Sequence, residues 1–263
     1  MMKLSWIATS AVAGIAVLAL ELVAVAGWQG WSRNRAVTPA VHAQVASLPD
    51  VRPVQAPPQV AGPASPEDGY YAQIRPQIRW IETRIGSDKL MTPDAGSRVL
   101  LAKSAAERAG LHEVGLSFKD VYGIINAETS WIPRTGASKD GTPNLGLAQF
   151  EPATARGLGL RDPNDPVEAI HVAAIHMKEA AGWSARRIAG LKLDRGEHAE
   201  KLREGVSIFY NLSVKGRNRW DGRNTAKLPI ETRLHIRNAR TGARHAEQLE
   251  MRMVSSGFIP TGG

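Results

Sequence analysis

Apolar residues recur with a helical period over most of the chain from residue 69 onward. Tyr70, Ile74, Ile78, Ile81 and Ile85 follow one another at steps of four, four, three and four, which predicts a first helix with Pro76 as a kink. No run of alternating β-branched residues is present, so the pattern predicts an all-α domain. Start and stop signals predict five further helices: from Thr92-Pro93-Asp94 to Gly110, from Ser117–Asp120, from Asp165-Pro166 to Gly182 or beyond, and over about 197–213 and 229–250.

The first 31 residues have a different pattern. Leu4 to Gly27 is almost wholly apolar and is interrupted only by Glu21. About 20 apolar residues cross the hydrocarbon core of a bilayer, so residues 1–31 are predicted to be a signal-anchor or a signal peptide, with Ala24-Val25-Ala26 as a cleavage motif. A buried core helix is the alternative, which we do not favour because core helices seldom run this long without polar residues.

Residues 32–68 are rich in proline and alanine. Seven prolines lie between residues 36 and 66, and they predict an extended linker rather than a regular helix. At about 3.1 Å per residue, roughly 30 residues of this kind span up to ~90 Å. Together with the apolar N-terminus, the linker predicts a periplasmic domain at residues 69–263 that is tethered to the inner membrane, unless the export signal is cleaved.

The amino-acid composition excludes several classes of protein and of functional site. The 263 residues contain no Cys, which excludes disulfide scaffolds, thiolate zinc sites and a catalytic thiol. The net charge is +8, of which residues 214–245 carry +7, because nine Lys and Arg are balanced there by only two acidic residues. Such a stretch attracts polyanions. Cell-wall carboxylates, anionic lipids and nucleic acid are the alternatives, besides a merely solvated helix face; for nucleic acid, Trp220 would stack on a base.

One carboxylate has unusual surroundings in the sequence. Glu128 follows the apolar stretch VYGIINA, precedes Trp131, and has no cation in its immediate sequence neighbourhood. A carboxyl group among apolar walls has a raised pKa and can donate a proton to a leaving oxygen, as in glycosidic bond cleavage. From this residue alone, an ordinary glutamate at a helix end remains the alternative.

Four short motifs then follow one another along the chain: Glu128-Thr129-Ser130-Trp131, Gly146-Leu147-Ala148-Gln149-Phe150 with Pro152-Ala153-Thr154-Ala155, Phe209-Tyr210-Asn211, and Pro229-Ile230-Glu231-Thr232-Arg233. In this order they resemble the motifs of the lytic transglycosylases of the soluble-transglycosylase, or goose-lysozyme-like, family. The resemblance covers about residues 116–240. It implies an α-helical lysozyme-like domain that acts on the glycan of peptidoglycan without a cofactor.

The resemblance also implies a role for individual residues. Glu128 matches the sole catalytic acid and base of the family, and Ser138 matches a serine near the N-acetyl group of the substrate. Glu231 matches a buried glutamate that supports the site from behind. The remaining matches are substrate-binding residues in the sugar cleft or facing the catalytic glutamate, namely Gly146, Gln149, Tyr210 and Asn211.

A transglycosylase of this kind needs one carboxylate, whereas retaining and inverting glycosidases need two. Glu128 is therefore expected to cleave the bond between N-acetylmuramic acid and N-acetylglucosamine and to leave a 1,6-anhydro end. Asp140 and Glu151 are close enough in sequence to act as a second carboxylate, so a hydrolytic muramidase and an inactive peptidoglycan-binding module stay open. The chain also departs from the usual motifs, with His235 where the family commonly has tyrosine.

A metal site is not expected. Glu168, His171 and His176 lie on one predicted helix, but a di-iron bundle needs a second Glu-x-x-His, which is absent from the sequence. We expect peptidoglycan strands as the partner, no nucleic acid, and the membrane through residues 1–31. A subsidiary hypothesis, based only on the tether and the linker, is that the enzyme opens the wall for an envelope-spanning secretion, conjugation or pilus machine.

Overall fold

Residues 66–138 and 140–256 are described by the structure, a computed structural model. They belong to the second of the two units into which the chain divides, Val60–Gly263. The predicted anchor at 1–31 and nearly all of the predicted linker at 32–68 lie outside the described residues. No helix within the described ranges is long and apolar enough to cross a membrane.

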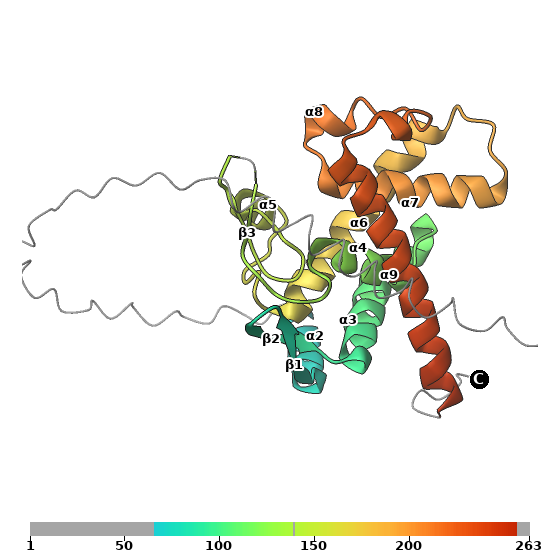
Figure 1. Cartoon of the computed structure of the whole chain (residues 1–263). Coiled ribbons are helices and arrows are strands. Elements are labelled where there is room, and N and C mark those ends of the chain that lie inside the picture. The colour runs from blue at the N-terminus through green and yellow to red at the C-terminus, as the bar shows by residue number, and fades with distance from the viewer. Residues whose placement is uncertain (1–65, 139, 257–263) are drawn as a thin grey trace, which may run out of the picture. The chain divides into compact units, whose positions relative to one another are not determined.

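Helices make up most of the described residues, as the sequence predicts (Figure 1). The α-helices are α2 (Pro66–Ile74), α3 (Ala95–Arg108), α4 (Phe118–Thr129), α5 (Pro152–Gly157), α6 (Pro166–Ile188), α7 (Arg195–Asn211), α8 (Val214–Arg217) and α9 (Ile230–Ser255). Between them lie three 3-10 turns, η1 (Arg75–Gln77), η2 (Leu111–Val114) and η3 (Thr225–Lys227), and four short strands, β1 (Trp80–Ile85), β2 (Asp88–Pro93), β3 (Gly136–Ala137) and β4 (Pro143–Asn144).

The predicted helix starts are confirmed where a side chain caps the backbone. Ser117 and Asp120 form a capping box at the start of α4, and Asp165 accepts hydrogen bonds from backbone N–H groups at the start of α6. The cap of α3 is Asp94, which accepts from the N–H of Ser97 at 2.7 Å, and not Thr92. Side-chain caps therefore fix where α3, α4 and α6 begin.

The prediction of one helix from Tyr70 to Ile85 is wrong in its second half. The helix ends at Ile74, η1 follows at the position of Pro76, and Trp80–Ile85 pairs with Asp88–Pro93 as an antiparallel hairpin. The turn is Gly86-Ser87, with Gly86 at a φ of 61°, which suits a two-residue hairpin loop. The described residues are therefore mostly helical but not all-α.

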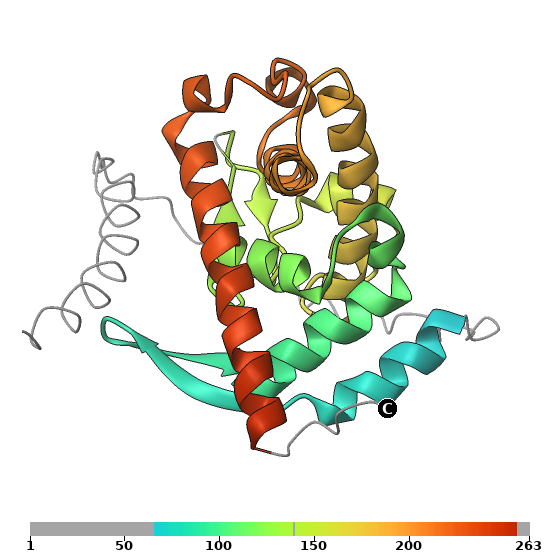
Figure 2. The same ribbon diagram turned by 90° about the vertical axis from the view of Figure 1, so that its right-hand side faces the viewer.

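The helices pack around α4 and α7. α4 lies along α9 and against α3, and α6 lies along α7. In Figure 2, α7 is seen end on, with α9 on one side and α6 on the other. The surfaces at which these helices meet contain completely buried aromatic and aliphatic side chains, among them Tyr122, Ile125, Ile170, Met177 and Ile208.

Two glycines let α4 and α9 approach closely. A Cβ atom on Gly123 would lie 2.4 Å from the carbonyl oxygen of Ala239, and one on Gly242 would lie 2.7 Å from Cβ of Asn126. Neither position has room for a larger residue. This close approach holds the middle of α9 beside the end of α4, where Glu128 lies.

Candidate active site

Glu128 lies in the last turn of α4 and is reachable from solvent. Its side chain is 16% exposed, so it is largely enclosed but not sealed. The helix ends directly after it, because Ser130 and Trp131 both take a positive φ, at 53° and 66°. The backbone beyond the turn is held by Thr92, whose hydroxyl donates to the carbonyl oxygen of Trp131 at 2.6 Å.

The partner of the Glu128 carboxyl group is a buried histidine. His235 on α9 places Nε2 2.8 Å from Oε1 of Glu128, and its Nδ1 lies 2.9 Å from the hydroxyl oxygen of Ser207 on α7. A neutral imidazole has one N–H donor and one acceptor nitrogen, and a hydroxyl group can donate or accept. The tautomer that carries Nε2–H therefore donates to Oε1 of Glu128, whether that group is ionised or protonated on its other oxygen, and accepts from the Ser207 hydroxyl at Nδ1.

The supporting role expected for Glu231 is not found in the structure. Glu231 lies in the first turn of α9 and is exposed. The buried face of this helix instead carries Thr232, His235 and Ile236, which are spaced three and four residues apart as one face of a helix requires. His235, one turn beyond Glu231, is the residue of α9 that contacts Glu128.

The loop Gly146–Gln149 is pinned against the end of α4. The hydroxyl of Thr129 donates to the carbonyl oxygen of Leu147 at 3.0 Å. Gly146 has a φ of 72°, and a Cβ atom there would lie 1.9 Å from the carbonyl oxygen of Pro163, so only glycine fits. Gln149 also has a positive φ, at 54°, and its Nε2 donates to the carbonyl oxygens of Arg134 and Gly146, each at 2.8 Å.

Arg134 was not expected at this site. Its guanidinium group donates to the main-chain carbonyl oxygen of Glu128 at 2.6 Å. Burial lowers the pKa of Arg134, and the negative charge of Glu128 opposes that shift. No cation lies beside Glu128 in the sequence, but the fold brings Arg134 to it. The turn at Ser130 and Trp131 reverses the chain, so that Arg134, six residues after Glu128, returns to the end of α4.

Tyr210 joins the same group from the end of α7. Its hydroxyl donates to the carbonyl oxygen of the buried Ala148 at 3.3 Å. Burial raises the pKa of Tyr210 well above its ordinary value, and the negative charge of Glu128 raises it further. Tyr210 is therefore a neutral hydrogen-bond donor close to Glu128. Asn211, the last residue of α7, is exposed, and its predicted contact with substrate stays a prediction.

Ser138 directly follows β3, in the loop that joins β3 to β4, and this hairpin packs against Gln149. A Cβ atom on Gly136 would lie 2.4 Å from Oε1 of Gln149, which shows how closely the two segments fit. The hydroxyl of Ser138 donates to the Glu151 carboxylate. The exposed Asp140 accepts the backbone N–H of Thr142 at 3.0 Å, and this hydrogen bond lowers its pKa. Both candidates for a second carboxylate are therefore hydrogen-bonded within this local segment.

Comparison of the chain with protein-family models, curated proteins and solved structures gives no match. The fold brings together four of the predicted site residues, Glu128, Gly146, Gln149 and Tyr210. It leaves Glu231 outside the site and adds Arg134, His235 and Ser207.

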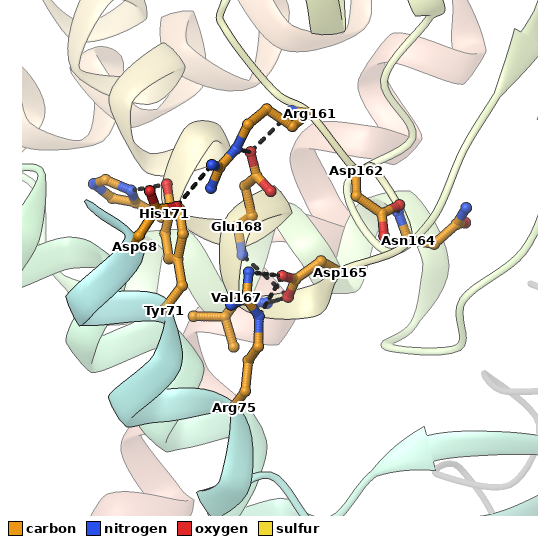
Figure 3. Close-up of polar contacts among 10 residues, drawn as sticks. All are labelled: Asp68, Tyr71, Arg75, Arg161, Asp162, Asn164, Asp165, Val167, Glu168 and His171. Carbon is orange, nitrogen blue, oxygen red and sulfur yellow. Dashed lines mark hydrogen bonds and ion pairs between the residues drawn. The ribbon is translucent and has the colours of Figure 1, made fainter. Parts of the chain in front are cut away.

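The Glu168 and His171 pair is a structural contact between α2 and α6 (Figure 3). Glu168 accepts from the backbone and side chain of Arg161, and Nδ1 of His171 lies 2.9 Å from the hydroxyl of Tyr71. Within the described ranges, no group of three or more His, Asp or Glu is arranged to hold a metal ion. His171 therefore ties the start of α6 to α2 directly, and Glu168 does so through Arg161, which donates to Asp68 of α2 at 2.7 Å.

Trp220 cannot serve as a platform for a nucleic-acid base. Its side chain is fully buried and stacks on Trp183, with ring centroids 5.6 Å apart. Its indole N–H donates to the hydroxyl of Thr225 at 3.0 Å. The aromatic feature that the nucleic-acid alternative used is therefore part of the core.

Proposed function

We propose that this domain is a lytic transglycosylase with a lysozyme-like fold, which cleaves the bond between N-acetylmuramic acid and N-acetylglucosamine in peptidoglycan. The observation that carries the proposal is the pairing of a partly exposed Glu128 with a buried His235, beside the Gln149 loop and Tyr210. A single carboxyl group with a fixed partner is what a one-carboxylate mechanism needs.

In the proposed reaction, Glu128 first protonates the glycosidic oxygen, and the bond from C1 of the muramic acid to that oxygen breaks. The N-acetyl oxygen of the substrate stabilises the positive charge at C1. The Glu128 carboxylate then removes the proton from the C6 hydroxyl of the same sugar, and O6 bonds to C1. Water is not consumed, because a hydroxyl group held next to C1 reacts in preference to solvent.

His235 supports both halves of this cycle. Oε1 of Glu128 accepts from Nε2–H of His235 in both states, and the Ser207 hydroxyl donates to Nδ1, so the other carboxyl oxygen is free to give its proton to the glycosidic oxygen and to take one from the C6 hydroxyl. The carboxyl group thus keeps one hydrogen bond and one orientation through both steps. His235 is a positioning residue, because it acts through Glu128.

Hydrolysis by a muramidase is the less favoured alternative. It needs a second carboxylate placed across the sugar from the first. Glu151 is engaged by Ser138, and the Asp140 carboxylate accepts the N–H of Thr142. A periplasmic location, a tether through residues 1–31, and recruitment by an envelope-spanning machine remain part of the proposal.

Mass spectrometry of digested peptidoglycan tests the proposal. The wild-type protein is expected to release fragments with anhydro ends, which are one water lighter than reducing ends. Glu128→Gln is expected to lower the rate by about 10²–10⁴-fold, the usual contribution of a general acid and base. Glu151→Gln is the matched control and is expected to keep the anhydro product.

Other outcomes would identify the alternatives. Reducing ends in place of anhydro ends would indicate a muramidase. Binding of sacculi without cleavage by the wild-type protein would indicate a glycan-binding module. DNA affinity that falls steeply with salt, with no action on sacculi, would favour the nucleic-acid alternative.

A further inference from the structure

A basic pocket lies between the end of α7 and the start of α9, the two helices that carry Tyr210 and His235. Its volume is about 480 Å³. The side chains of Arg219 and Lys227 contribute its charge, and Leu212, Leu228 and Pro229 contribute apolar surface. The pocket thus combines two cations with a small apolar wall.

Both cations are available to a ligand. Arg219 and Lys227 are exposed, and neither side chain forms an ion pair with another residue in the part of the chain that the structure describes. Asp221 is the one acidic residue between Val214 and Ile230. Its Oδ1 accepts the backbone N–H groups of Arg223 and Asn224, at 2.8 and 2.9 Å. Five Lys and Arg lie in the same stretch, so this one carboxylate does not cancel the positive charge of the pocket.

The walls of the pocket are fixed by buried neighbours. Trp220, directly after Arg219, is buried against Trp183. The side chain of Asn224 donates to the carbonyl oxygen of Arg219 at 2.8 Å, and the N–H of Lys227 donates to the carbonyl oxygen of Asn224 at 2.9 Å. A ligand therefore does not have to order this backbone when it binds.

Two residues of the pocket lie close along the chain to residues of the candidate site. Leu212 follows Tyr210 by two residues, and Pro229 precedes His235 by six. At 1.5 Å per residue, six residues of helix span ~9 Å. A substituent of a few residues on a sugar bound at Glu128 can reach across this distance.

We infer that the pocket binds a carboxylate of the peptide that branches from the peptidoglycan glycan. The inference rests on the proposed function, since that substrate is a glycan whose muramic acid residues carry short acidic peptides. Arg219 suits a carboxylate because a guanidinium group can donate two parallel hydrogen bonds to it, and Lys227 adds a second charge. Leu212 and Leu228 suit the small apolar side chains of such a peptide.

The test compares two forms of one substrate, cleaved by the full-length protein. The first is peptidoglycan with its peptide carboxylates intact, and the second is the same material with those carboxylates converted to amides. Two exposed ion pairs are together expected to raise kcat/KM about three- to tenfold for the carboxylate form. The double variant Arg219→Gln, Lys227→Gln is expected to remove this preference and to keep the wild-type rate on the amidated form.

A second double variant, Arg195→Gln with Arg252→Gln, controls for net charge. By helix rise, Arg195 lies ~25 Å from Leu212 along α7, and Arg252 lies ~35 Å from Pro229 along α9. This control is expected to keep the preference. Equal wild-type rates on the two substrates, or the same loss in the control, would overturn the inference and leave the proposed function standing.

Two further results separate the causes of failure. If no substrate yields anhydro ends, the proposed function fails, and the pocket inference fails with it. If the Arg219 and Lys227 variant loses affinity for a DNA oligonucleotide while the ratio of the two cleavage rates is unchanged, the pocket binds phosphate and the inference is overturned.

Discussion

Residues with a strained backbone gather at the candidate site. Ser130, Trp131 and Gln149 are the non-glycine residues with positive φ in the described ranges. Each such residue costs about 1–3 kcal/mol and persists only where its surroundings hold it. Here the surroundings are the hydrogen bonds of Thr129, Thr92 and Arg134. Strain at these positions supports a functional role for the two segments.

The pairing of Glu128 with His235 predicts a specific kinetic result. His235→Ala is expected to lower kcat about 10–100-fold with little change in KM, because the carboxyl group loses its fixed orientation but the sugar-binding residues remain. His235→Tyr, which introduces the residue common in the transglycosylases that the motifs resemble, is expected to restore part of the rate. Steady-state kinetics on soluble glycan fragments measures both. An unchanged kcat in His235→Ala would show that the hydrogen bond does not serve the reaction.

Ser207 allows the hydrogen-bonded chain Glu128–His235–Ser207 to be tested from its buried end. Ser207→Ala leaves Nδ1 of His235 without its partner, which is expected to lower the free energy of unfolding by about 1–3 kcal/mol and to reduce kcat. Ser104→Ala is the control, since the hydroxyl of Ser104 donates to the carbonyl oxygen of Leu101 in its own helix and interacts with Tyr70 rather than with His235. Chemical denaturation and kcat are the measurements. Equal effects of the two substitutions would argue against a role of the Ser207–His235 hydrogen bond in the reaction.

The sequence identified Glu128, Gln149 and Tyr210 but not Arg134 or the role of His235. The first three belong to motifs whose order is visible along the chain. Arg134 reaches the carbonyl oxygen of Glu128 only because Ser130 and Trp131 have positive φ, which no local sequence pattern predicts. For α9 a signal did exist: the helical spacing of Thr232, His235 and Ile236 separates a buried face from the exposed Glu231.

At the scale of elements, the register of α9 against α4 decides the position of His235. Gly242→Ala places a methyl group 3.0 Å from Cα of Gly123 and 2.7 Å from Cβ of Asn126. This overpacking is expected to lower the free energy of unfolding by about 1–3 kcal/mol and to reduce activity, because His235 lies two turns away on the same helix. Denaturation and a cleavage assay measure the two effects.

Gly182→Ala is the matched control for that substitution. Gly182 also lies inside a helix, α6, but the nearest atom to its added Cβ is the end of the flexible Arg186 side chain, at 3.6 Å. The substitution is expected to stabilise the protein by about 0.5–1 kcal/mol, since alanine is the better helix former. Destabilisation by both substitutions would contradict the packing argument.

The elements themselves were predicted unevenly. Helices with a side-chain cap and a long apolar face were found, since both signals are local. The β1 and β2 hairpin was missed because its isoleucines also fall at helical steps. Ile81, Thr83 and Ile85 are β-branched and fall at alternate positions, a run too short to stand out beside the helical spacing. Together with the Gly86-Ser87 turn they favour the hairpin that the structure has.

For the whole molecule, buried histidines predict how stability depends on pH. Burial lowers the pKa of His171 and of His176 below the ordinary value of 6.5. The unfolded chain therefore binds more protons than the folded one below about pH 6.5, and the free energy of unfolding falls as the pH decreases. Denaturation midpoints at pH 7.5 and pH 5.5 are expected to show the loss at the lower pH.

Two variants test whether the buried His171 causes part of this pH dependence of stability. His171→Gln removes a titrating group but keeps a hydrogen-bonding side chain beside Tyr71, and is expected to reduce the difference between pH 7.5 and 5.5. His198→Gln replaces an exposed histidine on α7 and is expected to leave it unchanged. A wild-type midpoint that rises on acidification would refute the sign of the prediction.

The spacing of His235 and Gly242 on α9 limits how this chain can change in length. The two residues are seven apart, two turns of helix, so the imidazole and the close-packed glycine face α4 together. Deleting or inserting one residue between them would turn the imidazole about 100° around the helix axis. Tolerated insertions and deletions are therefore expected in the surface turns, and never in this stretch of seven.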